Sequence, residues 1–394
     1  MKIFNKNVLV KSLLFSFLLT AILSVVSCEK KEVDPEDEPP VVNDDKWETE
    51  LVDSIAGVDV GIYNMLAFDV DSGIHIAYVV SEDNYSLKYA YKPYGGNWTV
   101  SEVANPISDN IIDIAVDKQK NVFIAYRGYE TGSDVNERMY IAEKSINGTF
   151  NKVQVDVLGD HNHQARYPAI YADNNDIIHL SFERANYGMR YTSYSFGGTF
   201  TLVETLDDDA SSSCSDIVID SEGNKHIIHF NGDDVYHSYC ANSENTWLVT
   251  QITTGDISAA SYEGISLAVD QFDNLHASYR YGSTSADNNI HYLYKPAGSS
   301  TWQEDGIENA GGSSRHDRAI ACDTLGNPHV LYDESFGLKI ASKNISWSHE
   351  AIFGNSDNRA DTNYDIEITD KNRAHVSFYV RSTGVLRYAT KRLE

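Results

Sequence analysis

The sequence predicts an all-β fold, a seven-bladed β-propeller with four antiparallel strands in each blade. Three observations lead to this prediction. A short motif of aspartate and turn recurs seven times, with histidine at its end in six copies and Phe123 in the other, and further stretches of alternating polar and apolar residues follow each copy. The last copy lacks one strand, which the beginning of the chain can supply. A helical repeat protein would need a 3.6-residue apolar period, and the repeats do not have one.

The motif is clearest at residues 323–332, Asp-Thr-Leu-Gly-Asn-Pro-His-Val-Leu-Tyr. Gly326 and Asn327 tolerate the positive φ of a tight turn, so we expect one strand to end at Asp323 and the next to begin at His329. The copy that begins at Asp370 is one residue shorter. Neighbouring copies begin 47–56 residues apart, a spacing typical of one blade, and the other five begin at Asp69, Asp117, Asp173, Asp220 and Asp270.

Two more strands complete each repeat. The third is short and alternates polar with apolar residues, at 87–89, 139–140, 189–191, 235–237, 290–292, 338–340 and 386–388. The fourth opens on an aromatic residue, at Trp98, Phe150, Phe200, Trp247, Trp302 and Trp347. Four short strands with a period of two predict one blade per repeat.

The seventh repeat ends at Glu394, six residues after Tyr388, and therefore has no fourth strand of its own. Residues 47–52 match residues 98–103, which form the fourth strand of the first repeat. We expect this N-terminal strand, at about residues 47–52, to complete the last blade and close the ring, which removes its open edges. Residues 46–394 are therefore predicted to form a single propeller domain.

Residues 1–27 contain Lys2, Lys6 and Lys11 and then an apolar run from about residue 13 to residue 26. The run is short for a membrane span and reads as a secretory signal. Val25-Val26-Ser27-Cys28 resembles a bacterial lipobox, although Val25 stands where leucine is usual. That resemblance implies cleavage before Cys28 and attachment of lipid to its sulfur. An ordinary signal peptide with a chance cysteine is the alternative.

Residues 28–45 are rich in acidic residues and proline, a composition typical of an extended tether. The charged stretch after Cys28 resembles the surface-export signals of Bacteroidetes lipoproteins. We therefore expect an exported protein, held on the outer membrane by its lipid alone, on the periplasmic or the cell-surface side. The formal charge of −27 predicts no nucleic-acid binding, because an acidic surface repels phosphate. We expect a monomer.

The region from Trp47 onward resembles the seven-bladed propellers of the sialidase-like and related carbohydrate-active superfamily. The resemblance covers nearly the whole mature chain, and it is architectural. The sialidase Asp-box, Ser-x-Asp-x-Gly-x-x-Trp, does not occur in the sequence, which argues against sialidase activity.

A residue that recurs at one position of every blade is expected to serve the blade, since seven blades cannot share one active site. The histidines of the motif are therefore predicted to be structural. They would be spread around a ring, so we expect no metal site and no cofactor. Cys214, Cys240 and Cys322 leave two alternatives open, buried free thiols or a Cys214–Cys240 disulfide. The six motif histidines are His75, His179, His226, His276, His329 and His375.

Function is expected where the blades differ, in the segments that lead into the first strand of each blade. Arginine can bind a carboxylate, histidine can move a proton, and tyrosine can stack on a sugar. The alternative is that these segments are ordinary polar loops. The predicted ligand-binding residues are Asn64, Arg166, Tyr262, Glu263, Arg315 and Tyr364. The candidate catalytic residues are His161, His163, Arg166, Tyr167, Arg315 and His316.

Two functions fit these residues. The first is a surface-tethered module that binds a glycan or a protein partner, favoured because the sequence has no catalytic signature. The second is a carbohydrate-active enzyme, because residues 161–167 resemble the site of propeller-fold polysaccharide lyases. That resemblance implies that Arg166 or Arg315 neutralises a uronate, while His163 or His316 moves protons with Tyr167. A glycoside hydrolase would instead need two carboxylates, for which Glu263 and Asp317 are the candidates.

Overall fold

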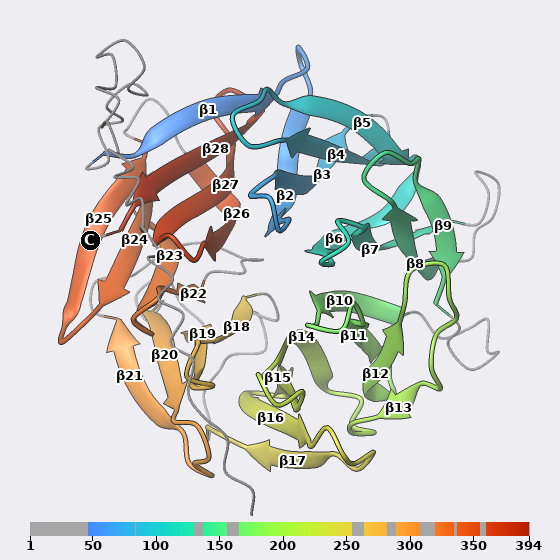
Figure 1. The fold of residues 1–394 in the computed structure, drawn as a ribbon, viewed down its shortest axis with the longest axis vertical. Helices are drawn as coiled ribbons and strands as arrows, with labels where there is room; N and C mark the ends of the chain where they lie inside the picture. Colours follow the sequence, from blue (N-terminus) through green and yellow to red (C-terminus); the bar gives the residue numbers. More distant parts are fainter. Residues whose placement is uncertain are drawn as a thin grey trace, which may run out of the picture. The chain divides into compact units, whose positions relative to one another are not determined.

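The computed structural model describes residues 46–82, 84–129, 137–155, 165–253, 264–281, 289–307, 320–334, 337–354 and 360–393. The chain divides into two units, Met1–Asn43 and Asp44–Glu394, and the described residues belong to the second. They form seven four-stranded antiparallel sheets, arranged as the blades of a ring (Figure 1). The predicted all-β, seven-bladed fold is confirmed. The predicted signal peptide, Cys28 and the tether lie outside the described residues.

Blades 1 to 3 follow one another along the chain, and in each the first strand is innermost. Blade 1 contains β2 (Asp59–Phe68), β3 (Ile74–Ser81), β4 (Tyr85–Lys92) and β5 (Thr99–Ala104). Blade 2 contains β6 (Ile107–Val116), β7 (Val122–Tyr129), β8 (Glu137–Lys144) and β9 (Asn151–Gln154). Blade 3 contains β10 (Ala165–Ala172), β11 (Ile178–Arg184), β12 (Gly188–Tyr194) and β13 (Glu204–Thr205).

Blades 4 to 6 repeat this order. Blade 4 contains β14 (Ser212–Ile219), β15 (Lys225–Asn231), β16 (Asp234–Cys240) and β17 (Leu248–Gln251). Blade 5 contains β18 (Ile265–Val269), β19 (Leu275–Tyr281), β20 (Asn289–Lys295) and β21 (Gln303–Ile307). Blade 6 contains β22 (Ile320–Cys322), β23 (Pro328–Glu334), β24 (Gly337–Lys343) and β25 (Trp347–Phe353).

Blade 7 is built from both ends of the described chain. Its inner strands are β26 (Ala360–Ile368), β27 (Arg373–Val380) and β28 (Val385–Arg392), and its outer strand is β1 (Glu48–Asp53). Glu50 pairs with Tyr388 and Leu51 with Arg387 across β1 and β28. The predicted closure of the ring by the N-terminal strand is therefore confirmed, one residue later than expected at each end.

In six of the seven blades, the turn after the first strand is organised by an aspartate. At Asp323, Oδ1 accepts the backbone N–H groups of Leu325 and Asn327, each at 2.8 Å. Oδ2 accepts the side-chain amide of Asn327 at 2.9 Å and lies 3.5 Å from His329 Nε2. Nδ1 of His329 is 2.7 Å from Ser342 Oγ on the third strand. The aspartate and the histidine therefore connect the turn to the blade.

The same contacts recur in other blades, with a third-strand tyrosine in place of the serine. Nδ1 of the histidine lies 2.7–2.8 Å from the tyrosine hydroxyl in the pairs His75–Tyr89, His179–Tyr191 and His276–Tyr292. In blade 4, His237 takes the tyrosine position, with Nε2 at 3.1 Å from His226 Nδ1. These contacts confirm that the motif histidines serve the blades.

The seventh turn corrects one prediction. Its hydrogen bonds start from Thr369, whose N–H donates to Arg373 O at 3.0 Å and whose carbonyl accepts the N–H of Asn372 at 2.9 Å. Thr369 lies six residues before His375, as each motif aspartate does in the other blades that have the histidine. The assignment of Asp370 as the anchor of a shortened repeat is wrong, because the repeat keeps its length and threonine replaces the aspartate.

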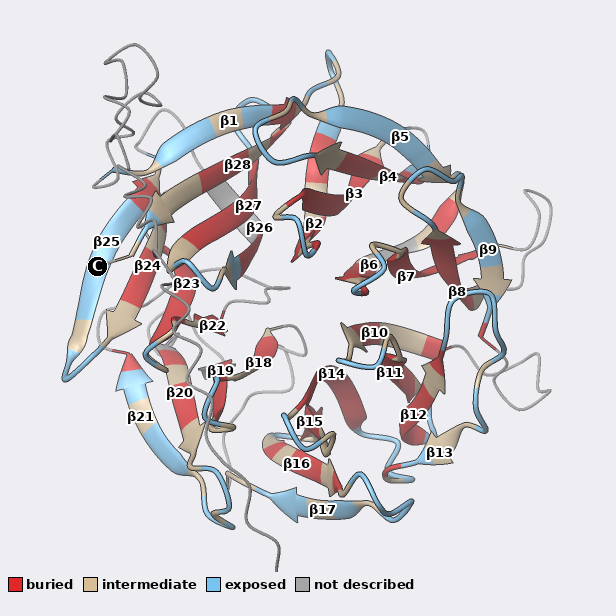
Figure 2. Cartoon of the chain, viewed as in Figure 1, coloured by how far each residue is buried: buried red, intermediate tan, exposed pale blue. Residues whose placement is uncertain are grey.

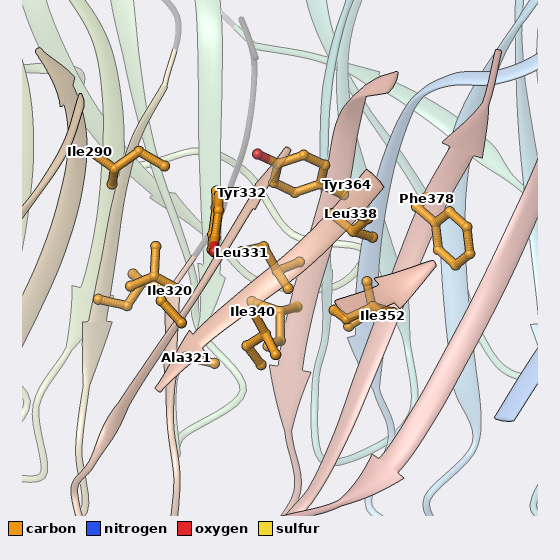
Figure 3. Packing of buried hydrophobic residues seen from close by; sticks show 14 of the residues in the cluster. Ile290, Ile320, Ala321, Leu331, Tyr332, Leu338, Ile340, Ile352, Tyr364 and Phe378 are labelled. Carbon is orange, nitrogen blue, oxygen red and sulfur yellow. The ribbon is translucent and has the colours of Figure 1, made fainter. Parts of the chain in front are cut away.

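Burial follows the position of a strand in its blade (Figure 2). The outer strands β1, β5, β17 and β25 are largely exposed, whereas the second and third strands are largely buried. Apolar clusters fill the spaces between neighbouring blades. In the cluster of blades 5 to 7, Leu331, Ile340 and Phe378 are almost completely buried (Figure 3). The described cysteines Cys214, Cys240 and Cys322 are free thiols.

Buried aspartates on three first strands bond the backbone of the next blade. Asp365 Oδ2 accepts the N–H of Leu66 at 2.7 Å, which joins blade 7 to blade 1. Asp113 accepts from Ile170 at 2.5 Å and Asp216 from Leu267 at 2.8 Å in the same way, and the three aspartates are at most 5% exposed. These carboxylates hold neighbouring blades together beside the central axis.

Carboxylates on the outer strands also join the blades. Glu50 on β1 accepts hydrogen bonds from Lys92 Nζ at 2.5 Å and from Trp98 Nε1 at 3.0 Å, both in blade 1. Asp305 does the same in blade 5 for two residues of blade 6, Lys343 and Trp347. The tryptophans that open the fourth strands therefore stabilise the ring.

Candidate functional site

The two ends of the ring carry different connections. The aspartate turns lie at one end, and the opposite end, called here the loop end, carries the links between second and third strands and the segments that lead into each first strand. Several connections at the loop end are outside the described residues. The predicted residues among them are His161, His163, Tyr262, Glu263, Arg315, His316 and Asp317. Their roles stay predictions.

Two predicted ligand-binding residues are deeply buried. Asn64, on β2, is 1% exposed, and its side-chain amide donates to Gly61 O at 3.0 Å. Tyr364, on β26, is 2% exposed and belongs to the apolar cluster of blades 5 to 7 (Figure 3). Neither side chain offers a surface to a ligand in this conformation, and their binding role stays a prediction.

Tyr167 has an unusual backbone conformation. It lies on β10 with φ of 50°, at a bulge between Arg166 and Ala169, and its half-buried ring packs on the apolar cluster that contains Cys214. A positive φ costs energy for a residue with a side chain and can mark a functional site. Cys214 also has a positive φ, 36°, at the corresponding bulge of blade 4. Because the feature recurs, we attribute it to the blade.

Arg166 is brought beside a buried acid. It pairs in register with Glu183 across β10 and β11. Glu183 is 7% exposed. Burial raises the pKa of Glu183 to about 7, although the positive charges of Arg166 and, next, of Arg127 act to lower it. The cross-strand pair therefore holds a carboxyl group that can change its protonation state near neutral pH.

Arginines gather at the loop end of blades 2 and 3. Five of the thirteen arginines in the sequence lie there, near the ends or the beginnings of β7, β8, β10, β11 and β12. This concentration is notable in a chain whose formal charge is −27. We call the set the loop-end arginines, and it comprises Arg127, Arg138, Arg166, Arg184 and Arg190.

Two of the loop-end arginines are committed to partners inside the fold. Arg127 pairs with Glu137, and both side chains are largely shielded from solvent. Arg190, 3% exposed, donates to Asp208 Oδ1 at 2.9 Å and to the carbonyl oxygens of Met189 and Asp207. These two guanidinium groups stabilise the surrounding loops.

Arg184 has a different environment. It is half-buried, and its guanidinium carbon lies 4.6 Å from the ring centroid of Tyr187, which is 40% exposed. Its Nε atom is buried without a hydrogen-bond partner. Within the described part of the chain, Arg184 has no ion pair and no side-chain hydrogen bond. Arg184 therefore presents a cation stacked on an aromatic ring, with donors to spare.

The hairpin between β11 and β12 fixes this arrangement. The N–H of Tyr187 donates to Arg184 O at 2.7 Å, and Asn186 and Gly188 have positive φ values of 65° and 84°. A Cβ atom at Gly188 would lie 2.4 Å from Asp207 O, so only glycine fits against the neighbouring loop. The tight turn holds the arginine and the tyrosine side by side at the loop end.

Sequence reasoning missed Arg184 because it considered only the segments that lead into first strands. A signal was present eleven residues after the motif aspartate. The corresponding residues in the other six blades are Val80, Gly128, Asn231, Tyr281, Glu334 and Val380, so this position differs from blade to blade and carries arginine in blade 3. The same rule that predicted Arg166, a departure from the repeat, also selects Arg184.

A central cavity of about 370 Å³ runs along the axis of the ring. All seven first strands line it, mainly with isoleucine, alanine, valine and leucine, and Tyr171, Cys322 and Glu367 are among the exceptions. None of the loop-end arginines lines this cavity. The loop-end arginines are therefore separate from the central cavity.

The described residues show neither a metal-binding group nor a membrane-spanning helix. They contain no group of three or more histidine, cysteine or acidic side chains placed to hold a metal ion. They also contain no helix with the length and hydropathy of a membrane span.

No protein-family model matches the sequence, and no curated protein matches it. Similar solved structures include an inactive variant of virginiamycin B lyase from Staphylococcus aureus, determined with quinupristin. Its TM-score is 0.57 at 14% identity, covering 88% of this chain and 100% of that chain. A protein of unknown function from Dyadobacter fermentans has a TM-score of 0.54 at 10% identity, covering 88% of this chain and 98% of that chain.

The NanB sialidase from Streptococcus pneumoniae matches with a TM-score of 0.49 at 9% identity, covering 87% of this chain and 70% of that chain. A sialidase propeller is thus among the similar structures. At identities of 10–14%, the likenesses to the lyase and to the Dyadobacter fermentans protein show a common fold and nothing about ligand or activity.

Proposed function

We propose that the protein is an exported, lipid-anchored binding module whose loop end holds an acidic glycan at blades 2 and 3. The observation that carries this proposal is Arg184. Its guanidinium stacks on the partly exposed ring of Tyr187 and has no carboxylate partner in the described part of the chain. Arg166 lies on the neighbouring strand, where Ala165 pairs with Arg184.

The chemistry of the pair favours a sugar acid. A planar guanidinium donates two parallel hydrogen bonds to a carboxylate, and a tyrosine ring covers the apolar face of a sugar. Neutral glycans would use the tyrosine alone. In a protein that is otherwise acidic, the guanidinium of Arg184 gives local attraction for an anion that the rest of the surface repels.

Equilibrium binding of the full chain to immobilised polysaccharides tests the proposal. We expect polygalacturonate to bind and neutral dextran not to bind. Arg184→Gln should weaken binding by about ten- to a hundredfold, because a hydrogen-bonded ion pair contributes about 1.5–3 kcal/mol. Arg387→Gln is the matched control, since Arg387 also lies over an aromatic ring, Phe353, but on blade 7.

Three results would contradict the proposal. They are equal binding of the acidic and neutral polysaccharides, an Arg184→Gln variant that binds like wild type, and equal losses in the Arg184 and Arg387 variants. In the last case the effect would come from the loss of any stacked arginine and would carry no information about the loop end.

Anchoring by Cys28 is the second part of the proposal, and it rests on residues 25–28 of the sequence. Expression in a bacterium that lipidates exported proteins should place the full chain in the membrane fraction, with a labelled fatty acid attached. Cys28→Ser should release it, whereas Cys240→Ser should not. A Cys28→Ser protein that stays lipidated in the membrane would contradict the anchor.

A polysaccharide lyase is the alternative activity, and its predicted histidines His163 and His316 lie outside the described residues. Incubation with uronate-containing polysaccharides tests it, because β-elimination creates an unsaturated uronate that absorbs ultraviolet light. A rise in absorbance that His163→Ala or His316→Ala abolishes would support the lyase. If absorbance does not rise with any of the polysaccharides, the lyase is excluded as the alternative and the binding module remains the proposal.

A further inference from the structure

Glu183 is a buried acid next to the proposed site. Its side chain is 7% exposed, and Glu183 pairs in register with Arg166. No hydrogen bond to its carboxyl group is found in the described part of the chain. A buried carboxylate without such bonds is unfavourable, so this environment favours the neutral, protonated form.

The charged groups around Glu183 come from two other strands. Arg166 lies on β10, and Arg127 lies on β7 of blade 2, where Glu137 pairs with it. On β12 the residue in register with Glu183 is Met189, which is apolar. Burial raises the pKa of Glu183 to about 7, against the effect of the two arginines. Near neutral pH the group is therefore divided between its charged and neutral forms.

We propose that the loop-end site takes up its carboxylated ligand together with a proton, which Glu183 accepts from solvent. This inference rests on the proposed function. Glu183 and Arg184 are consecutive on β11, so their side chains point to opposite faces of the blade, and a carboxylate bound at Arg184 would act on Glu183 across the strand. Protonation of Glu183 removes the repulsion between the two carboxyl groups.

Coulomb's law gives the size of the effect that a bound carboxylate has on the pKa of Glu183. A unit negative charge held at roughly 10 Å, with an effective dielectric constant of about 20, shifts a neighbouring pKa upward by about one unit. Proton uptake on binding therefore strengthens the affinity as the pH falls. Between about pH 6 and pH 8, the dissociation constant should rise by up to about tenfold.

Titration calorimetry of the full chain with trigalacturonate tests the inference. Binding is measured at about pH 6 and pH 8, in two buffers of different ionisation enthalpy, which reveals the number of protons taken up. Wild type should take up a fraction of a proton near neutral pH and bind more weakly at the higher pH. The Glu183→Gln variant should bind with the same affinity at both pH values and should take up no proton. Glu143→Gln, a change at another buried glutamate outside the site, should retain the wild-type behaviour.

The outcomes separate the two proposals. Equal wild-type affinity at both pH values, with no proton uptake, overturns the inference and leaves the proposed function. No binding at either pH overturns the proposed function. In that case, carbon-13 NMR of the labelled glutamate carboxyls, with sulfate as the probe anion, decides the inference. We expect Glu183 to titrate near pH 7 and its midpoint to rise with sulfate, and an unmoved midpoint overturns the inference.

Discussion

At the scale of single residues, Asp323 stabilises its turn through hydrogen bonds from Leu325 and Asn327. Hydrogen bonds to a charged group contribute about 1.5–3 kcal/mol, and the amides left behind would be partly buried. We expect Asp323→Ala to lower the free energy of unfolding by about 2–3 kcal/mol in urea. The control is Asp370→Ala, an exposed position, which should change it by less than about 0.5 kcal/mol. Equal losses would contradict the assignment of Thr369 as the seventh anchor.

The turn aspartates also predict how stability depends on pH. Burial alone would raise the pKa of Asp69, Asp173 and Asp220, but hydrogen bonds from the adjacent histidine and the turn amides outweigh it and lower each pKa to about 2. Unfolded aspartate titrates near 3.9. Each carboxylate therefore contributes about 2 kcal/mol above about pH 5, and this contribution is lost as the pH falls toward 2.

The buried histidines act in the same direction. Burial and then the charge of Arg373 lower the pKa of His375 to about 3, whereas an unfolded histidine titrates near 6.5. The unfolded chain binds the proton first, so stability falls as the pH drops from 6.5 toward 3. Glu183 acts in the opposite direction down to about pH 4, because its pKa is raised to about 7. The urea midpoint should therefore decrease steadily below about pH 4, and Asp69→Asn should flatten that slope. A constant or rising midpoint below pH 4 would contradict this account.

At the scale of elements, Asp365 joins blade 7 to blade 1 through the N–H of Leu66. Asp365→Ala would leave that buried N–H without a partner, which costs about 1–3 kcal/mol. Asp216→Ala, which breaks the same contact between blades 4 and 5, is the matched comparison and should cost a similar amount. Urea unfolding measures both, and a loss below about 0.5 kcal/mol at either site would show that these bonds do not hold the blades together.

The elements were largely predictable because each signal occurs several times. Seven turns, six fourth-strand aromatics and an orphan strand at the N-terminus agree on one architecture, so errors in single copies do not matter. The error at Asp370 arose because threonine can take the aspartate position, with its N–H and carbonyl making the turn bonds. The hydrogen bonds that Asp113, Asp216 and Asp365 accept from the next blade were not predicted. They connect residues of different blades and depend on the closed ring.

At the scale of the whole molecule, the sequence predicts that function lies at the loop end, where the segments differ between blades, and this stays a prediction. The site itself was less predictable. Arg166 was selected, but its buried partner Glu183 depends on strand pairing that the sequence does not reveal. Arg184 was overlooked because it lies in a link between second and third strands. Asn64 and Tyr364 proved to be buried, because residues next to a bulge can point either into the core or outward.

The central claim is that the loop end of blades 2 and 3 binds an acidic glycan through Arg184. The most direct test is a crystal structure of the full chain with trigalacturonate bound. We expect a uronate carboxylate within hydrogen-bond distance of the Arg184 guanidinium and its sugar ring against Tyr187. A ligand seated in the central cavity beside Tyr171 and Glu367, with the Arg184 guanidinium untouched, would contradict the claim.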